Sequence, residues 1–179
     1  HYRSRADAAP ATTGDFRTDE ATLNTLQMLV EIVRESRRRT SDVFPLPDIE
    51  GCIDYAITEA GECLDAILRD NRLGDKRNRD KAHDARREWG QCGYMILSAL
   101  IQMPPEAMNI SYTGDESVYD MLLWLCLYKT ADDETALSDA LQVYVNLCNA
   151  TGWGDLALMR ETCAAFERKH SPETAPVEN

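Results

Sequence analysis

Residues 49–68 read Ile-Glu-Gly-Cys-Ile-Asp-Tyr-Ala-Ile-Thr-Glu-Ala-Gly-Glu-Cys-Leu-Asp-Ala-Ile-Leu. Apolar side chains recur in this stretch every three or four positions, at Ile49, Ile53, Ala56, Ile57, Ala60, Leu64, Ile67 and Leu68. This period is typical of a helix that buries one face. The same spacing continues through most of the chain, and no alternating β-branched run competes with it. The sequence therefore predicts an all-α bundle.

The chain is expected to fold as one domain, because 179 residues suffice for one sizeable core and barely for two. We expect the helical domain at residues 18–171, between flexible tails at 1–17 and 172–179. Its first helix should fray in the basic run Arg37-Arg38-Arg39. The remaining helices are predicted near 48–70 and 80–102, with additional C-terminal helices within 116–170.

Charge and cysteine usage restrict the function classes. A formal charge of −12 argues against binding to nucleic acid or to an anionic membrane, since phosphates are held by clustered Lys and Arg. The six cysteines contain no Cys-x-x-Cys pair and lie among apolar helical residues, so we expect buried free thiols. The apolar run 121–127 is far shorter than the roughly 20 residues that span a bilayer. These features predict a cytoplasmic protein.

Two pairs of oxygen-bearing side chains are each spaced three apart, Glu59 with Glu62 and Glu88 with Gln91. Three positions turn a helix by about 300°, so each pair projects from nearly one face. Two such helices side by side would bring together three carboxylates and one amide. Oxygen-only sites suit Mg²⁺ or Mn²⁺. From the residues alone, a second interpretation stays open, in which Glu59 and Glu62 are solvated or paired with Arg69, Arg86 or Arg87.

The stretches 58–67 and 87–97 resemble the metal motifs of the MazG-like all-α nucleoside triphosphate pyrophosphohydrolases, which include the dimeric dUTPases. That pattern is Glu-x-x-Glu on one helix and Glu-x-x-Asp on the next, separated by a polar loop. The resemblance covers 20–102 and, loosely, the final helix, whereas 103–152 is additional. Gln91 stands where the family has Asp, and an amide oxygen binds a hard cation without contributing charge.

The resemblance implies that Glu59, Glu62, Glu88 and Gln91 bind Mg²⁺, with Mn²⁺ as a substitute, and that the three glutamates are the catalytic residues. The implied reaction cleaves a nucleoside triphosphate to its monophosphate and pyrophosphate. The residues expected to contact phosphates are basic: Lys76, Arg79, Lys81, Arg168 and Lys169. The implied assembly is a homodimer, unless 103–170 replaces the second subunit. The alternative function, suggested by Gln91, is a bundle of the same fold that binds a nucleotide or a protein without cleavage. Neither the base nor the sugar of the nucleotide follows from the sequence.

Overall fold

The computed structural model describes residues 20–73, 84–104, 117–131 and 135–170. This part of the chain is helical and contains no strand, which confirms the all-α prediction. The helices are α1 (Glu20–Thr40), α2 (Ile49–Leu73), α3 (Ala85–Leu100), α4 (Val118–Ala131), α5 (Thr135–Thr151) and α6 (Asp155–Lys169).

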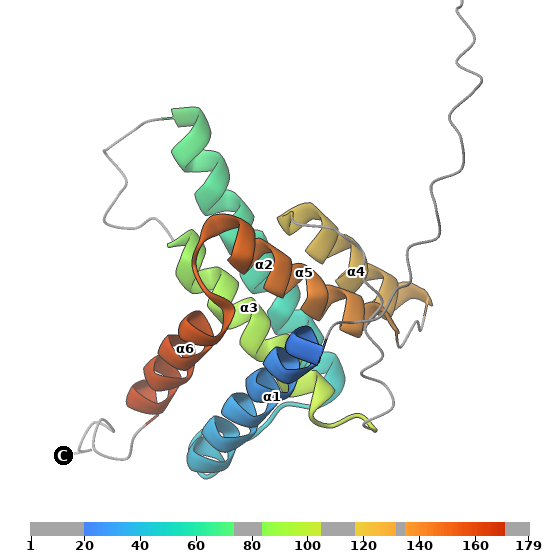
Figure 1. The fold of residues 1–179 in the computed structure, drawn as a ribbon, viewed down its shortest axis with the longest axis vertical. Helices are drawn as coiled ribbons and strands as arrows, with labels where there is room; N and C mark the ends of the chain where they lie inside the picture. The colour runs from blue at the N-terminus through green and yellow to red at the C-terminus, as the bar shows by residue number, and fades with distance from the viewer. Residues whose placement is uncertain (1–19, 74–83, 105–116, 132–134, 171–179) are drawn as a thin grey trace, which may run out of the picture.

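Helix α3 forms the centre of the bundle, in contact with α1, α2, α5 and α6. Every residue from Glu88 to Leu100 except Gln91 is buried. The contact of α3 with α2 is the most extensive between any two described helices. Helices α1 and α6 lie together on one side of the molecule, and α4 and α5 lie together on another (Figure 1). The core is therefore built around a helix that carries two of the candidate site residues, Glu88 and Gln91.

Local side-chain and backbone chemistry sets the ends of the helices. The carboxylate of Asp48 accepts a hydrogen bond from the backbone N–H of Gly51 (2.8 Å) and so caps α2. Asp84 caps α3 in the same way through the N–H of Arg86 (3.0 Å). Helix α3 ends at Leu100, before the predicted residue 102. Residues 80–83, where its start was predicted, lie outside the described residues.

The break between α5 and α6 falls at the Thr-Gly-Trp-Gly stretch, residues 151–154. Gly152 has φ 71° and Gly154 has φ 70°. Residues with a side chain rarely adopt this left-handed backbone conformation. The two glycines therefore allow the chain to reverse within a few residues and bring α6 back onto α3.

The prediction that α1 frays at its basic run is wrong at Arg37. The helix continues to Thr40, and Arg37 is only 5% exposed. Its Nε donates to Ser98 Oγ (2.9 Å), and its guanidinium carbon lies 5.2 Å and 4.6 Å from the ring centroids of Phe44 and Tyr94. None of the described carboxylates forms an ion pair with it. Aromatic faces thus hold this buried cation in place of an anion.

The cysteine prediction holds for five of the six thiols. Cys52, Cys63, Cys92, Cys148 and Cys163 are buried and unpaired, whereas Cys126 is exposed. Cys126 lies on α4, the most apolar of the described helices, whose apolar residues are not confined to one face. Such a helix does not reveal from its sequence which side faces the core. No described helix combines the length and the apolarity needed to cross a membrane.

We expect a thiol-specific reagent such as dithionitrobenzoate to label one cysteine of the native protein rapidly, namely Cys126. Burial raises the pKa of the other thiols, to about 11 for Cys52 and Cys163 and to about 12 for Cys63 and Cys148, so they remain protonated and unreactive. The measurement is the labelling stoichiometry before and after denaturation. Cys126→Ser should remove the rapid phase, and rapid labelling of a second thiol would contradict the packing described here.

Candidate metal centre

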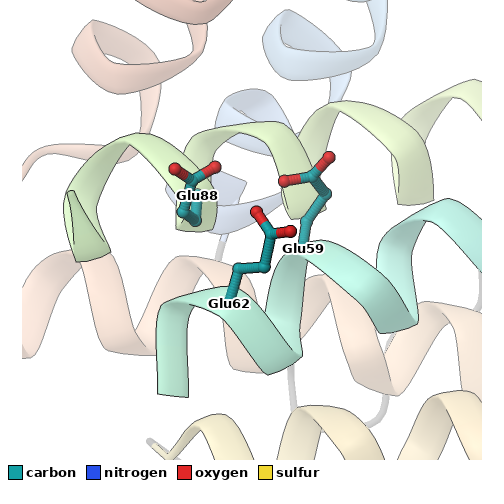
Figure 2. Close-up of side chains that lie close together, drawn as sticks. All are labelled: Glu59, Glu62 and Glu88. Atoms are coloured by element: carbon teal, nitrogen blue, oxygen red, sulfur yellow. The ribbon is translucent and has the colours of Figure 1, made fainter. Parts of the chain in front are cut away.

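Three carboxylates from two neighbouring helices converge at one place. Glu59 and Glu62 project from α2 and Glu88 projects from α3 (Figure 2). One carboxylate oxygen of each lies within 4.8 Å of the others. The three side chains thus form one cluster, as their spacing in the sequence predicts. We call it the acidic cluster.

The packing of α2 against α3 explains why these residues meet. Ala60 and Cys63 of α2 are fully buried against the core, so Glu59 and Glu62 fall on the flank of the same face. Glu88 lies in the first turn of α3 and is only 1% exposed. A carboxylate this deeply buried requires partners or a cation.

Both oxygens of Glu88 have partners on its own helix. Arg87 donates to Oε1 from Nε (3.0 Å) and from Nη2 (2.5 Å). The side-chain nitrogen of Gln91 donates to Oε2. Glu88 is therefore ion-paired with Arg87, whereas the sequence offered that arginine as a partner for Glu59 or Glu62. Gln91 contacts the cluster through its nitrogen, so in this conformation it holds Glu88 rather than offering an oxygen to a cation.

Glu59 is held in an environment that favours its protonated form. Its pKa is raised to about 7, first by burial, then by a hydrogen bond with Glu88, and then by the negative charges of Glu88 and Glu62, while Arg87 acts in the opposite direction. Oε2 of Glu59 is buried and has no hydrogen-bond partner among the described residues. An unsatisfied carboxylate oxygen inside a cluster of like charge is a position where a cation would be stabilised.

A cavity of about 760 Å³ opens over the acidic cluster. One side is formed by α2 and α3, including the cluster, Asp84 and Arg86. The other side is α6, which contributes Glu161, Phe166 and the basic residues Arg168 and Lys169 among others. Arg86 and Glu161 join the two sides through an ion pair (2.5 Å). The volume is within the range of small-molecule sites in proteins.

The structure brings together most, and not all, of the residues singled out in the sequence. Arg168 and Lys169 line the same cavity as the acidic cluster. Lys76, Arg79 and Lys81 lie outside the described residues. The roles of Arg86 and Glu161 across the cavity were not predicted, because only the folded chain brings α6 against the start of α3. For Arg87 a signal existed, since it precedes Glu88 directly in the sequence.

The donor set fits a hard divalent cation. Its ligands would be carboxylate oxygens of Glu59, Glu62 and Glu88, and oxygen ligands of this kind suit Mg²⁺ and Mn²⁺ better than Zn²⁺. The unpartnered Oε2 of Glu59 supports the fit. Three clustered carboxylates can bind such a cation. No protein-family model, no curated protein and no solved structure matches the chain.

Proposed function

We propose that this protein is a metal-dependent nucleoside triphosphate pyrophosphohydrolase, which cleaves a nucleotide or deoxynucleotide to its monophosphate and pyrophosphate. The observation that supports the proposal best is the acidic cluster at the wall of a cavity that is also lined by four cationic side chains, Arg86, Arg87, Arg168 and Lys169. A triphosphate carries several negative charges, so its recognition needs both a bound cation and basic groups. The cavity offers residues for each purpose.

In this proposal Glu59, Glu62 and Glu88 hold the ion. A bound Mg²⁺ supplies charge neutralisation for the phosphate oxygens and lowers the pKa of a water molecule. The carboxylates position the reacting groups, and one of them accepts the proton that the attacking water loses. The oxygen of this water bonds to the α-phosphorus, and the bond from that phosphorus to the bridging oxygen breaks. Pyrophosphate leaves with that oxygen.

Arg168 and Lys169 would contact the distal phosphates. Both lie in the last turn of α6 and line the cavity. An arginine can bind phosphate oxygens through two parallel hydrogen bonds, whereas a lysine acts as a point charge. Phe166, one turn before Lys169, is the aromatic side chain in the cavity wall. Its ring already stacks on Tyr94, with 4.5 Å between the centroids.

A second function is favoured by Gln91. Its amide replaces the fourth carboxylate that the resemblance implies and donates to Glu88. A cluster with one negative charge fewer binds a second cation more weakly. The alternative is therefore a bundle of the same kind that binds a nucleotide or a protein without cleaving a substrate.

The homodimer stays a prediction, because the structure describes one chain. Within it, α4 packs on α2, and α5 packs on α3. The cavity is formed by residues of a single chain, from α2, α3, α6 and the N-cap of α3. This arrangement is compatible with residues 103–170 taking the place of a second subunit.

The test is pyrophosphate release from a panel of nucleoside and deoxynucleoside triphosphates, dUTP included, with Mg²⁺ and then with Mn²⁺. We expect release from at least one nucleotide, dependent on the metal and lost in Glu59→Gln. Asp65→Asn is the matched control, because Asp65 lies on the same helix, pairs with Arg69 (2.7 Å) and is outside the acidic cluster. Release that survives in Glu59→Gln would exclude the cluster as the active site.

A parallel measurement separates the two candidate functions. If the metal and a nucleotide together raise the melting temperature but no pyrophosphate is released, the binding function replaces the catalytic one, since a ligand that binds the native state must stabilise it. If neither the metal nor any nucleotide changes the melting temperature of the wild-type protein, both proposals are wrong.

A further inference from the structure

Arg87 is the cation closest to the acidic cluster, and it occupies an oxygen that a metal ion would need. Its guanidinium makes two hydrogen bonds to Oε1 of Glu88. Gln91 takes the other oxygen of the same carboxylate. In this conformation each carboxylate oxygen of Glu88 accepts at least one hydrogen bond. A metal ion at Oε1 of Glu88, which already accepts two hydrogen bonds from Arg87, would have to displace at least one of them.

Arg87 is the donor that can move at little cost. Its side chain is 63% exposed, while Glu88 is 1% exposed. Among the described residues, Glu88 is the only hydrogen-bond partner of the Arg87 side chain. Rotating Arg87 away therefore leaves no buried group of its own unsatisfied and opens no void in the core. Glu88, in contrast, cannot leave its position without disturbing the packing of α3.

Electrostatic repulsion makes the two cations compete for Glu88. A guanidinium and a divalent ion on one carboxylate oxygen would lie a few ångströms apart, where like charges repel strongly in a partly buried site. Binding of the metal and binding of Arg87 to Glu88 are thus alternatives. By linkage, each weakens the other to the same degree.

The displaced guanidinium would remain over the cavity, because Arg87 is itself one of the residues that line it. A guanidinium released from one oxyanion there is placed to bind another, and phosphate is a preferred partner of arginine. Together with the proposed function, on which this inference rests, the geometry points to a single role. We propose that Arg87 neutralises the acidic cluster in the metal-free protein and, when a divalent cation binds, exchanges Glu88 for a phosphate of the substrate.

Arg86 provides a matched control in the adjacent position. It has the same charge and also lines the cavity, but its partner is Glu161 of α6 (2.5 Å) rather than a member of the acidic cluster. Replacing either arginine by glutamine changes the net charge equally. Only the replacement of Arg87 removes a direct competitor for Glu88.

The first measurement is the affinity of the nucleotide-free protein for Mn²⁺, read from the electron paramagnetic resonance signal of the free ion. We expect Arg87→Gln to bind Mn²⁺ about tenfold more tightly than the wild-type protein, within the usual range of coupling between two sites. Arg86→Gln should change the affinity by less than about threefold, because exposed charges at longer range are screened by salt. Equal affinities of the two variants, or weaker binding by Arg87→Gln, would overturn the proposal.

The second measurement is calorimetric binding of inorganic pyrophosphate at saturating Mg²⁺. Here the same variant should change in the opposite direction, with binding about tenfold weaker in Arg87→Gln, because a charge-assisted hydrogen bond is lost. Equal pyrophosphate affinities of Arg87→Gln and Arg86→Gln would show that Arg87 does not bind a phosphate of the substrate. If neither the wild-type protein nor Arg87→Gln binds Mn²⁺, the proposed metal site is wrong. If both bind Mn²⁺ with equal affinity, the site exists and only the role of Arg87 is wrong.

Discussion

Gly93→Ala is expected to destabilise the protein by about 3 kcal/mol, although alanine favours helices over glycine by about 1 kcal/mol. A Cβ atom at position 93 would meet the ring of Tyr144, 2.5 Å from Cδ2 and 2.9 Å from Cζ. The ring cannot easily retreat, because Tyr144 is fully buried and stacks on Trp89. Its hydroxyl also donates to the carbonyl of Asp155 (3.3 Å). The measurement is the free energy of unfolding in urea.

The matched control is Gly61→Ala, which changes a glycine inside α2 where a Cβ atom would meet nothing within 4 Å. Here helix propensity acts alone, so the free energy of unfolding should rise by about 1 kcal/mol. Opposite signs for the same chemical change would show that the contact of α3 with α5 determines the first result. Two stabilised variants would mean that α3 and α5 are not in close contact in solution.

Glu59→Gln is expected to stabilise the metal-free protein at pH 8 by about 2 kcal/mol, and to leave its stability nearly unchanged at pH 4.5. The pKa of Glu59 is about 7 in the folded protein and near 4.5 in the unfolded chain. Between these pH values the folded state binds the proton of Glu59 more tightly than the unfolded chain does. The resulting contribution to the free energy of unfolding is therefore complete below about pH 4.5, and it disappears as the pH rises through 7. Glutamine does not titrate and keeps the shape of the protonated carboxyl. The magnitude allows for partial screening by solvent.

The measurement is urea unfolding at several pH values in the presence of a chelator, with Asp65→Asn as the control on the same helix. The control should follow the wild-type protein across the pH range, since the ion pair of Asp65 with Arg69 lies at the surface. Parallel curves for Glu59→Gln and the wild-type protein would show that Glu59 does not take up a proton on folding. Under the proposed function, Mg²⁺ at pH 8 should restore stability to the wild-type protein and not to Glu59→Gln.

Features encoded by local pattern were predictable. The periodic stripe of α2, the cap at Asp48 and the glycine break after α5 all depend on residues close together in the chain. The meeting of Glu59 and Glu62 with Glu88 was predictable for a similar reason. Two consecutive helices joined by a loop normally pack side by side, so the spacing on each helix was enough.

Features that depend on distant segments were not predictable. Arg37 looks solvent-exposed in sequence because it belongs to a run of three arginines, and only the folded chain surrounds it with Phe44, Tyr94 and Ser98. Glu161 reaches the cavity because α6 returns to α3 after two intervening helices. Its position on α6 gave no sign of that contact.

Helix α4 shows how weak interactions can determine a unique structure. Because it is apolar on all sides, burying a different face would cost little hydrophobic free energy, and several rotations about its axis would be nearly equivalent. In the rotation that the structure shows, the ammonium of Lys129 contacts both Glu50 (2.7 Å) and Asp54 (2.8 Å) of α2. Surface ion pairs of this kind add little to the free energy of unfolding. Yet a difference of about 1.4 kcal/mol between two rotations already sets their populations ten to one. We therefore expect the ion pairs of Lys129 to add to the burial of Val118, Met121 and Leu125 in favouring the native rotation of this helix.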